Sequence, residues 1–172
     1  MNFLELAESR YSCRKFTDRT VEPQKIEQIL SAAIAAPTAV NRQPFRIWVM
    51  KSEQAIRAIR SCTTCHFGAS LFFVVGCDPE KSWVRPFDGR NYAEVDASIA
   101  AAHMMLEIQD LGLGTTWVGY FDAPMLKELC PQMAPYDLLA IFPVGYPSEG
   151  PQGQPSERHF SRKSRDELVE TL

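Results

Sequence analysis

The sequence predicts an α+β fold in which a central mixed sheet carries helices on its faces. Strand-like apolar runs interleave with helix-like repeats, but few cleanly spaced β-α-β units occur, which disfavours a regular doubly wound sheet. No internal repeat or linker-like boundary divides the 172 residues, a length that suits one domain with a sizeable core. We therefore expect a single domain over residues 1–172.

The first half of the chain is expected to supply three helices and two strands. Asn2 can cap a helix that ends near Arg10, and Pro23 suits the start of the next helix, which Pro37 ends. Apolar residues recur in this second helix at Ile26, Ile29, Leu30, Ala33 and Ile34. The remaining elements are an alternating strand at 45–50, a short helix after Ser52, an irregular stretch at 62–68 and a continuously apolar strand at 71–77.

The second half should contain the longest helix, at residues 93–111, after a polar and aromatic loop at 80–90. Gly112 is a natural terminator for this helix. Its core stripe is expected at Val95, Ile99, Ala102, Leu106 and Leu113. Further elements are a strand at 115–120, a helix from the Asp122 cap to Leu129, a strand at 138–144, a Pro/Gly-rich arm at 146–160 and a short helix opened by a capping box at Ser164.

A short loop after the second helix concentrates polar side chains. Between Pro37 and Pro44, the side chains of Thr38, Asn41 and Gln43 both donate and accept hydrogen bonds. Such density between two apolar elements suits a flat ligand that is rich in heteroatoms. The alternative interpretation is an ordinary helix-to-strand turn.

A basic cluster near the N-terminus favours the ligand interpretation. Arg10, Arg14 and Lys15 place three cations around the hydroxyl of Ser12, and arginine matches phosphate oxygens in a bidentate manner. The alternative is a solvated basic turn. Against that, the cluster interrupts a chain of net charge −3 and lies one helix before the amide-rich loop.

These two motifs resemble the nitroreductase family of FMN-dependent oxidoreductases. The resemblance begins with Arg10-x-Ser12-x-Arg14 and with the loop from Ala36 to Phe45. It continues along most of the chain in residues 111–119, in residues 143–147 and in Arg162-Lys163-Ser164. Residues 62–92 depart most from the family pattern, and this is the region that often shapes the substrate side.

The resemblance implies a mainly antiparallel sheet, an interlocked homodimer and a bound FMN, with NADH or NADPH as the co-substrate. Residues 147–172 would form a C-terminal arm that docks on the partner subunit. The nicotinamide would deliver hydride and be replaced by a small-molecule electron acceptor such as a nitro compound or a quinone, without a catalytic side chain. The implied cofactor-binding residues are Arg10, Tyr11, Ser12, Arg14, Pro37, Thr38, Asn41, Gln43, Trp117, Val118, Gly119, Arg162 and Lys163.

The net charge and the N-terminal residues bear on the cellular location of the protein and on the classes of partner that it binds. A net charge of −3 argues against nucleic-acid binding, because a basic face is its usual footprint. The N-terminus has Glu5 and Glu8 but no apolar export core, and no apolar run is long enough to span a bilayer. We therefore expect a cytoplasmic protein without a membrane partner.

The cysteines offer one competing motif. Cys62-x-x-Cys65-His66 matches the haem attachment pattern, but that chemistry belongs to exported proteins. A zinc site would need a fourth ligand, and none is obvious. The five cysteines are thus expected to be free thiols, with no metal.

Two other functions remain open from the sequence. One is a flavin-binding sensor or carrier protein with little turnover. The other is a flavin-destructase or dehalogenase-type relative that reuses the same fold. Neither the physiological acceptor, nor the choice between NADH and NADPH, nor the sensitivity to oxygen follows from the residues.

Overall fold

The computed structural model describes residues 2–172. Its strands are β1 (Phe45–Met50), β2 (Leu71–Cys77), β3 (Gly114–Thr115) and β4 (Asp137–Gly145). Its helices are α1 (Phe3–Ser9), α2 (Pro23–Ile34), α3 (Glu53–Cys62), α4 (Ala93–Asp110), α5 (Ala123–Leu129), α6 (Glu157–Phe160) and α7 (Arg165–Leu168). Three short 3₁₀ turns complete the list: η1 (Ala39–Asn41), η2 (Pro131–Met133) and η3 (Pro151–Gly153).

The four strands form one sheet in the order β1-β2-β4-β3, and each neighbouring pair is antiparallel. All seven residues of β2 are buried, as the continuously apolar run predicts. Within residues 2–172, parallel pairing is confined to an isolated bridge between Ser12 and Thr115. The expected α+β class, with a mixed and mainly antiparallel sheet, is confirmed.

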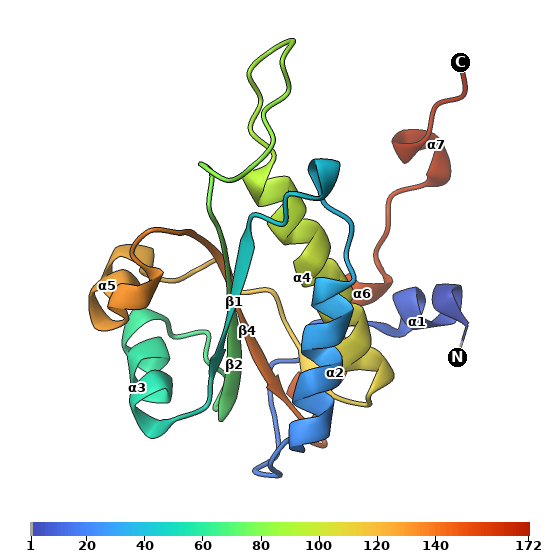
Figure 1. Cartoon of the computed structure of the whole chain (residues 1–172). Coiled ribbons are helices and arrows are strands. Elements are labelled where there is room, and N and C mark those ends of the chain that lie inside the picture. The colour runs from blue at the N-terminus through green and yellow to red at the C-terminus, as the bar shows by residue number, and fades with distance from the viewer. Residues whose placement is uncertain (1) are drawn as a thin grey trace.

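Helices cover both faces of the sheet. Alternation along β2 sends Phe73 and Val75 towards α2 and α4, and sends Phe72 and Val74 towards α3 and α5. Figure 1 shows the two helical layers on opposite sides of the strands. The core is therefore divided into two apolar clusters by the sheet itself.

Local capping chemistry fixes the starts of four α-helices and the end of α4 where the sequence predicts them. The side chains of Asn2, Ser52, Asp122 and Ser164 each accept a hydrogen bond from a backbone N–H of the first helical turn. Gly112 adopts a φ of 71° just beyond α4, where a β-carbon would be strained. No helix within residues 2–172 is both long and apolar enough to cross a membrane.

The predicted core stripe of α4 is wrong for all of its helical members. Val95, Ile99 and Leu106 are half-buried and Ala102 is exposed, whereas Leu113, beyond the helix, is buried as expected. The helix buries a different face, formed by Ala93, Asp96, Ala97, Ala100, Ala101, Met104, Met105 and Ile108. Small alanine side chains on this face let α4 approach α2 and the sheet closely. The larger aliphatic residues are left on an outer face, and Val95, Ile99 and Ala102 line a hollow of about 420 Å³ there.

Three further features of the structure differ from the sequence prediction. Ile34 at the end of α2 is 64% exposed, because it lies one residue past the face of Ile26, Ile29 and Ala33. Cys62 belongs to α3 and not to the irregular stretch. The Pro/Gly-rich arm is not simply extended, because it contains η3 and α6.

The strand expected at 115–120 is interrupted. Only Gly114 and Thr115 pair continuously with β4, and pairing resumes at Val118, which exchanges hydrogen bonds of 2.9 and 3.0 Å with Ile141. The register is the same on both sides of the break. The break lies opposite Pro143, which has no N–H to donate to a ladder.

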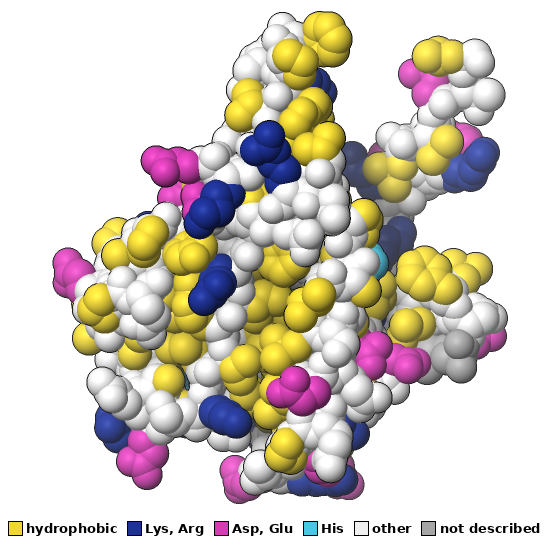
Figure 2. All heavy atoms as spheres, viewed as in Figure 1, with side chains coloured by type: hydrophobic (Ala, Val, Ile, Leu, Met, Phe, Trp, Pro, Cys, Tyr) yellow, Lys and Arg dark blue, Asp and Glu magenta, His cyan; other side chains and the backbone are white. Residues whose placement is uncertain are grey.

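A loop at residues 78–92 projects from the body before α4 (Figure 1). It is a hairpin-like turn closed by a bridge between Val84 and Asn91 and by an ion pair between Arg85 and Asp88. Phe87 is 94% exposed, and Figure 2 shows that this projection carries apolar side chains. The predicted polar and aromatic loop is therefore present.

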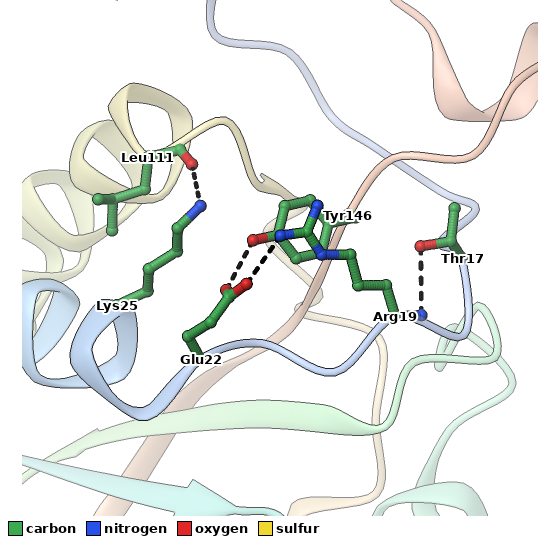
Figure 3. A network of polar contacts seen from close by, with 6 residues as sticks. All are labelled: Thr17, Arg19, Glu22, Lys25, Leu111 and Tyr146. Atoms are coloured by element: carbon green, nitrogen blue, oxygen red, sulfur yellow. Dashed lines mark hydrogen bonds and ion pairs between the residues drawn. The ribbon is translucent and has the colours of Figure 1, made fainter.

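A polar network ties the start of α2 to the end of α4 and to the segment after β4 (Figure 3). Glu22 accepts hydrogen bonds from the hydroxyl of Tyr146 at 2.6 Å and from Arg19 at 2.8 Å. The guanidinium of Arg19 also stacks on the Tyr146 ring at 3.9 Å. Lys25 donates to the carbonyl of Leu111 at 2.7 Å, where α4 leaves unpaired carbonyl groups.

This network predicts a pH-dependent contribution to stability. The hydrogen bonds from Tyr146 and Arg19 lower the pKa of Glu22 from 4.5 to about 2. A lowered carboxyl pKa stabilises the fold above the unfolded value, and that contribution is lost as the pH falls towards the folded value. Glu22→Gln should therefore be less stable than wild type at neutral pH. This gap in the free energy of unfolding should close as the pH falls from about 4.5 to about 2.

Denaturant unfolding of both proteins across this pH range measures the gap. Glu27→Gln, with an exposed side chain on the same helix, controls for the change in net charge. A gap for Glu22→Gln that stays constant with pH would contradict the assignment.

Candidate functional site

The basic segment at the N-terminus is held in place by β3 and the C-terminal arm. Ser12 bridges Thr115, and the N–H of Cys13 donates to the Thr115 carbonyl at 2.9 Å. On the other side, the N–H of Arg14 donates to the carbonyl of Gln152 at 3.1 Å. The segment therefore runs as an extra strand-like edge, and its side chains are fixed relative to the sheet.

Close packing at Gly114 makes this arrangement possible. A β-carbon at Gly114 would lie 2.7 Å from Cβ and 2.8 Å from Sγ of Cys13, closer than such atoms approach. The backbone is ordinary at this position, so glycine is required for space. Because Gly114 has no side chain, the basic segment can lie directly against the sheet.

Tyr11 connects the basic segment to the arm. Its hydroxyl donates to the carbonyl of Gly153 at 2.7 Å, and its ring meets His159 edge-on with centroids 6.4 Å apart. Burial raises the pKa of Tyr11, which keeps the hydroxyl protonated and able to donate. The η3 turn passes so close to the preceding part of the arm that a β-carbon at Gly153 would lie 1.9 Å from the Ser148 carbonyl oxygen.

A cavity of about 660 Å³ opens between the basic segment and α6. It is lined by Arg10, Tyr11, Ser12, Arg14, Ser156, Glu157, Arg158, His159 and Arg162. Four arginines face a single carboxylate, so the cavity has a strong excess of positive charge. Burial, and to a smaller extent the nearby charge of Arg162, lowers the pKa of Arg10. Such a cavity is suited to an anion with several oxygens.

The fold brings together five of the predicted cofactor-binding residues at this cavity. These are Arg10, Tyr11, Ser12, Arg14 and Arg162. Lys163 is exposed and does not line the cavity. The sequence prediction missed Ser156, Glu157, Arg158 and His159. The spacing of Arg158, His159 and Arg162 within five residues of the arm was an available signal for the cationic part of this set.

The amide-rich loop has an unusual backbone. Val40, Asn41 and Gln43 have φ values of 45°, 56° and 50°, in the left-handed region that non-glycine residues rarely adopt. Thr38 Oγ1 accepts from the N–H of Gln43 at 3.0 Å, and the Gln43 amide donates to Asn41 Oδ1 at 3.1 Å. Pro37 is exposed at the start of the loop. Strained backbone of this kind is typical of a binding loop.

The third group of predicted residues follows β3. Trp117 is 38% exposed and meets Phe142 edge-on with ring centroids 5.0 Å apart, while Val118 is buried against Ile141. Gly119 is exposed, with open space where a side chain would be. Neither this group nor the loop at 37–43 lines the arginine cavity of the same chain.

The cysteines are thiols in apolar surroundings. Burial raises the pKa values of Cys13, Cys62, Cys77 and Cys130, to about 11 in the case of Cys77. Cys65 is half-buried, and Nδ1 of His66 accepts a hydrogen bond from Gly68. Among residues 2–172, no group of three metal-ligating side chains is placed to hold an ion.

Comparison with known proteins is consistent with this geometry. The model of the Nitroreductase family matches residues 7–71 and 66–146. A solved nitroreductase family protein from Clostridium difficile 630 is 39% identical, covers 100% of both chains and has a TM-score of 0.90. The chain belongs to the nitroreductase family.

Two other relatives bear on the chemistry. A curated relative from Methanothermobacter thermautotrophicus, whose name pairs NADH dehydrogenase with NAD(P)H nitroreductase, is 28% identical over 88% of this chain and 80% of its own length. A protein from Desulfovibrio desulfuricans, solved in complex with FMN, is 26% identical over 100% of this chain and 98% of its own, with a TM-score of 0.80.

Proposed function

We propose that this chain is an FMN-dependent oxidoreductase that takes hydride from NADH or NADPH and reduces a nitro compound, a quinone or a similar acceptor. The observation that carries the proposal is the arginine-lined cavity between the N-terminal segment and α6. When bound, FMN supplies the hydride chemistry, and the protein binds and orients it. The relative solved with FMN and the relative named for NAD(P)H activity support this choice.

The cavity fits the phosphate end of FMN. Arg10, Arg14 and Arg162 offer charged donors, and Ser12 adds a hydroxyl at the same cavity. This compact cluster matches one terminal phosphate, and residues 2–172 show no glycine-rich loop for a second. Lys163 follows Arg162 directly and is proposed to add its charge from the rim of the site.

The remaining ligand contacts need a second copy of the chain. We assign Trp117, Val118 and Gly119 to the isoalloxazine ring from the same subunit. Pro37, Thr38, Asn41 and Gln43 would contact the ring from the partner subunit, as the resemblance of this loop to the family implies. The amide and hydroxyl groups of the loop then bind the heteroatoms of the ring.

Two surfaces are available for such a homodimer. The outer face of α4 presents an apolar hollow lined by Val95, Ile99 and Ala102 together with Leu139. The arm beyond α6 stands away from the sheet and helices in Figures 1 and 2, and residues 161–172 are all exposed. The segment at residues 161–172 is therefore suited to dock on a partner, and we propose that the C-terminal arm at residues 147–172 docks through it.

No side chain of the site is needed as an acid or a base. Hydride leaves the nicotinamide and reaches the acceptor through the bound cofactor, and the acceptor takes its proton from water. The arginines and amides of the assigned set carry no group that titrates near neutrality. These residues therefore act by binding and orientation.

The proposal predicts that the purified protein is yellow, holds FMN, and is bleached rapidly by NADH or NADPH. Mass spectrometry of heat-released flavin identifies the cofactor, and anaerobic stopped-flow against a panel of quinones and nitro compounds follows bleaching and reoxidation. Slow or absent bleaching would favour a sensor or carrier. Loss of the flavin itself or release of halide from a haloaromatic substrate would favour a flavin-destructase or dehalogenase. Recovery of flavin adenine dinucleotide alone would contradict the cofactor assignment.

A further inference from the structure

Asp96, in the first turn of α4, is a buried carboxylate with an incomplete set of partners. It is 1% exposed, and its Oδ1 accepts a hydrogen bond of 2.9 Å from the N–H of Ala39. Its Oδ2 is buried and has no hydrogen-bond partner within residues 2–172. We propose that Asp96 is a positioning residue that holds the amide-rich loop in its flavin-binding conformation. This inference rests on the function proposed above.

The contact reaches the strained part of the loop. Ala39 is the first residue of η1, and it is followed directly by Val40 and Asn41, both at positive φ. Val40 is β-branched, so the left-handed region is particularly unfavourable for it. Backbone of this kind persists only where the surroundings impose it. The hydrogen bond to Ala39 acts at the residue where that conformation begins.

Asp96 provides the loop's hydrogen bond to the body of the protein. The other hydrogen bonds of residues 38–43 join loop residues to one another: Asn41 to Thr38, Arg42 to Ala39, and Gln43 to both Thr38 and Asn41. Within the described chain, Ala39 to Asp96 is the one hydrogen bond that connects these six residues to another element. The internal bonds define the shape of the turn, and Asp96 fixes its location against α4.

A carboxylate is a costly choice for a purely structural anchor. Burying a charge is unfavourable unless it is fully paired, and here one oxygen lacks a donor. The position in the first turn of a helix offsets part of that cost, because the helix dipole favours a negative charge there. The charge in turn strengthens the single hydrogen bond to Ala39. This arrangement makes the loop more rigid, and it lowers the free energy of unfolding of the protein relative to a fully paired anchor.

The experiment measures the loop and the ligand separately in the full-length protein. We compare wild type with Asp96→Ala and Asp96→Asn. Met104→Ala is the control, because Met104 is fully buried on the same face of α4 but lies eight residues further along the helix than Asp96 (104 − 96). The readouts are amide hydrogen exchange at Ala39 and Asn41 in flavin-free protein, the melting temperature, and dissociation constants for FMN and riboflavin. Riboflavin lacks the phosphate, so it reports on the ring and ribityl contacts without the arginine cavity.

Asp96→Ala should accelerate exchange at Ala39 and weaken FMN and riboflavin by the same factor, about 10- to 150-fold, as expected for loss of a charge-assisted hydrogen bond. The riboflavin dissociation constant divided by the FMN dissociation constant should stay at the wild-type value. Loss of an arginine from the cavity should instead reduce this ratio, because it weakens the binding of FMN alone. Asp96→Asn keeps an acceptor of the same size and should lie between wild type and Asp96→Ala. Met104→Ala should lower the melting temperature and leave both constants unchanged.

Three outcomes would overturn the inference. One is wild-type flavin affinity in both Asp96 variants. Another is an equal loss of affinity in Met104→Ala at equal destabilisation. The third applies if Asp96→Ala does not fold: it is a folded Asp96→Asn protein whose amide hydrogen exchange and flavin affinity equal those of wild type. Wild-type protein that binds neither flavin would instead remove the proposed function, and this result is distinct from flavin binding that is insensitive to Asp96.

Discussion

Arg10→Ala is expected to weaken FMN binding by about 10- to 150-fold, because a charge-assisted hydrogen bond contributes roughly 1.5–3 kcal/mol. Arg10 lines the cationic cavity, and its pKa is lowered by burial and by Arg162, so it is poised to gain from a bound phosphate. The variant should therefore purify with little flavin.

Turnover measured against added FMN distinguishes a binding role from a catalytic one. Activity of Arg10→Ala should recover substantially at saturating FMN, because no step of the proposed reaction needs the arginine as an acid or base. His103→Ala and Cys65→Ala are the controls, and both should keep the turnover of the loaded enzyme. An Arg10→Ala variant that stays inactive when saturated with FMN would be inconsistent with this mechanism. Loss of reduction in folded, flavin-loaded Cys65→Ala would be equally inconsistent.

Ile99→Asp is expected to abolish both the dimer and flavin retention. Ile99 lies in the hollow on the outer face of α4, and an unpaired carboxylate buried in an interface there would cost several kcal/mol. If the loop at 37–43 reaches the partner's flavin, a monomer also lacks half of the ring contacts. Light scattering and the flavin absorbance of the same sample report both effects.

Leu129→Asp provides the matched control for this prediction. Leu129 is 47% exposed on α5, in the helical layer on the other face of the sheet. The same change in charge there should leave the dimer and the flavin in place. An Ile99→Asp protein that remains a flavin-loaded dimer would exclude this face of α4 as the interface, and an active, flavin-loaded wild-type monomer would exclude the shared site altogether.

Elements encoded by local chemistry could be predicted from the sequence. The caps at Asn2, Ser52, Asp122 and Ser164 act within one helical turn, and the strand at 71–77 is apolar at every position. The choice of face on α4 could not be predicted, because apolar residues lie on both sides of that helix. Periodicity identifies an apolar face but does not say whether it packs on its own sheet or remains outside. The break at residues 116–117 depends on Pro143 in another strand.

Part of the candidate site could also be predicted from the sequence, namely the part whose residues are close together along the chain. Arg10, Ser12 and Arg14 are close in sequence, and a motif can show them, whereas their meeting with Arg158 and Arg162 requires the arm to fold back. Asp96 gives no signal of its own, because an acidic residue in the first turn of a helix is ordinarily a solvated one. Its contact with Ala39 spans 57 positions and follows only from the packing of α4 against the loop.

Under the function proposed above, the burial of the cysteines limits the reaction of the protein with quinones and nitro compounds. Such substrates and their partly reduced products are electrophiles, and they alkylate thiolates rather than thiols. Cys13 adjoins the cationic cavity, where Arg14 favours the thiolate, but burial is the larger effect and raises its pKa. Cys62, Cys77 and Cys130 are likewise kept protonated by burial. Because four of the five thiols are buried, the half-buried Cys65 is the one most open to alkylation by such products.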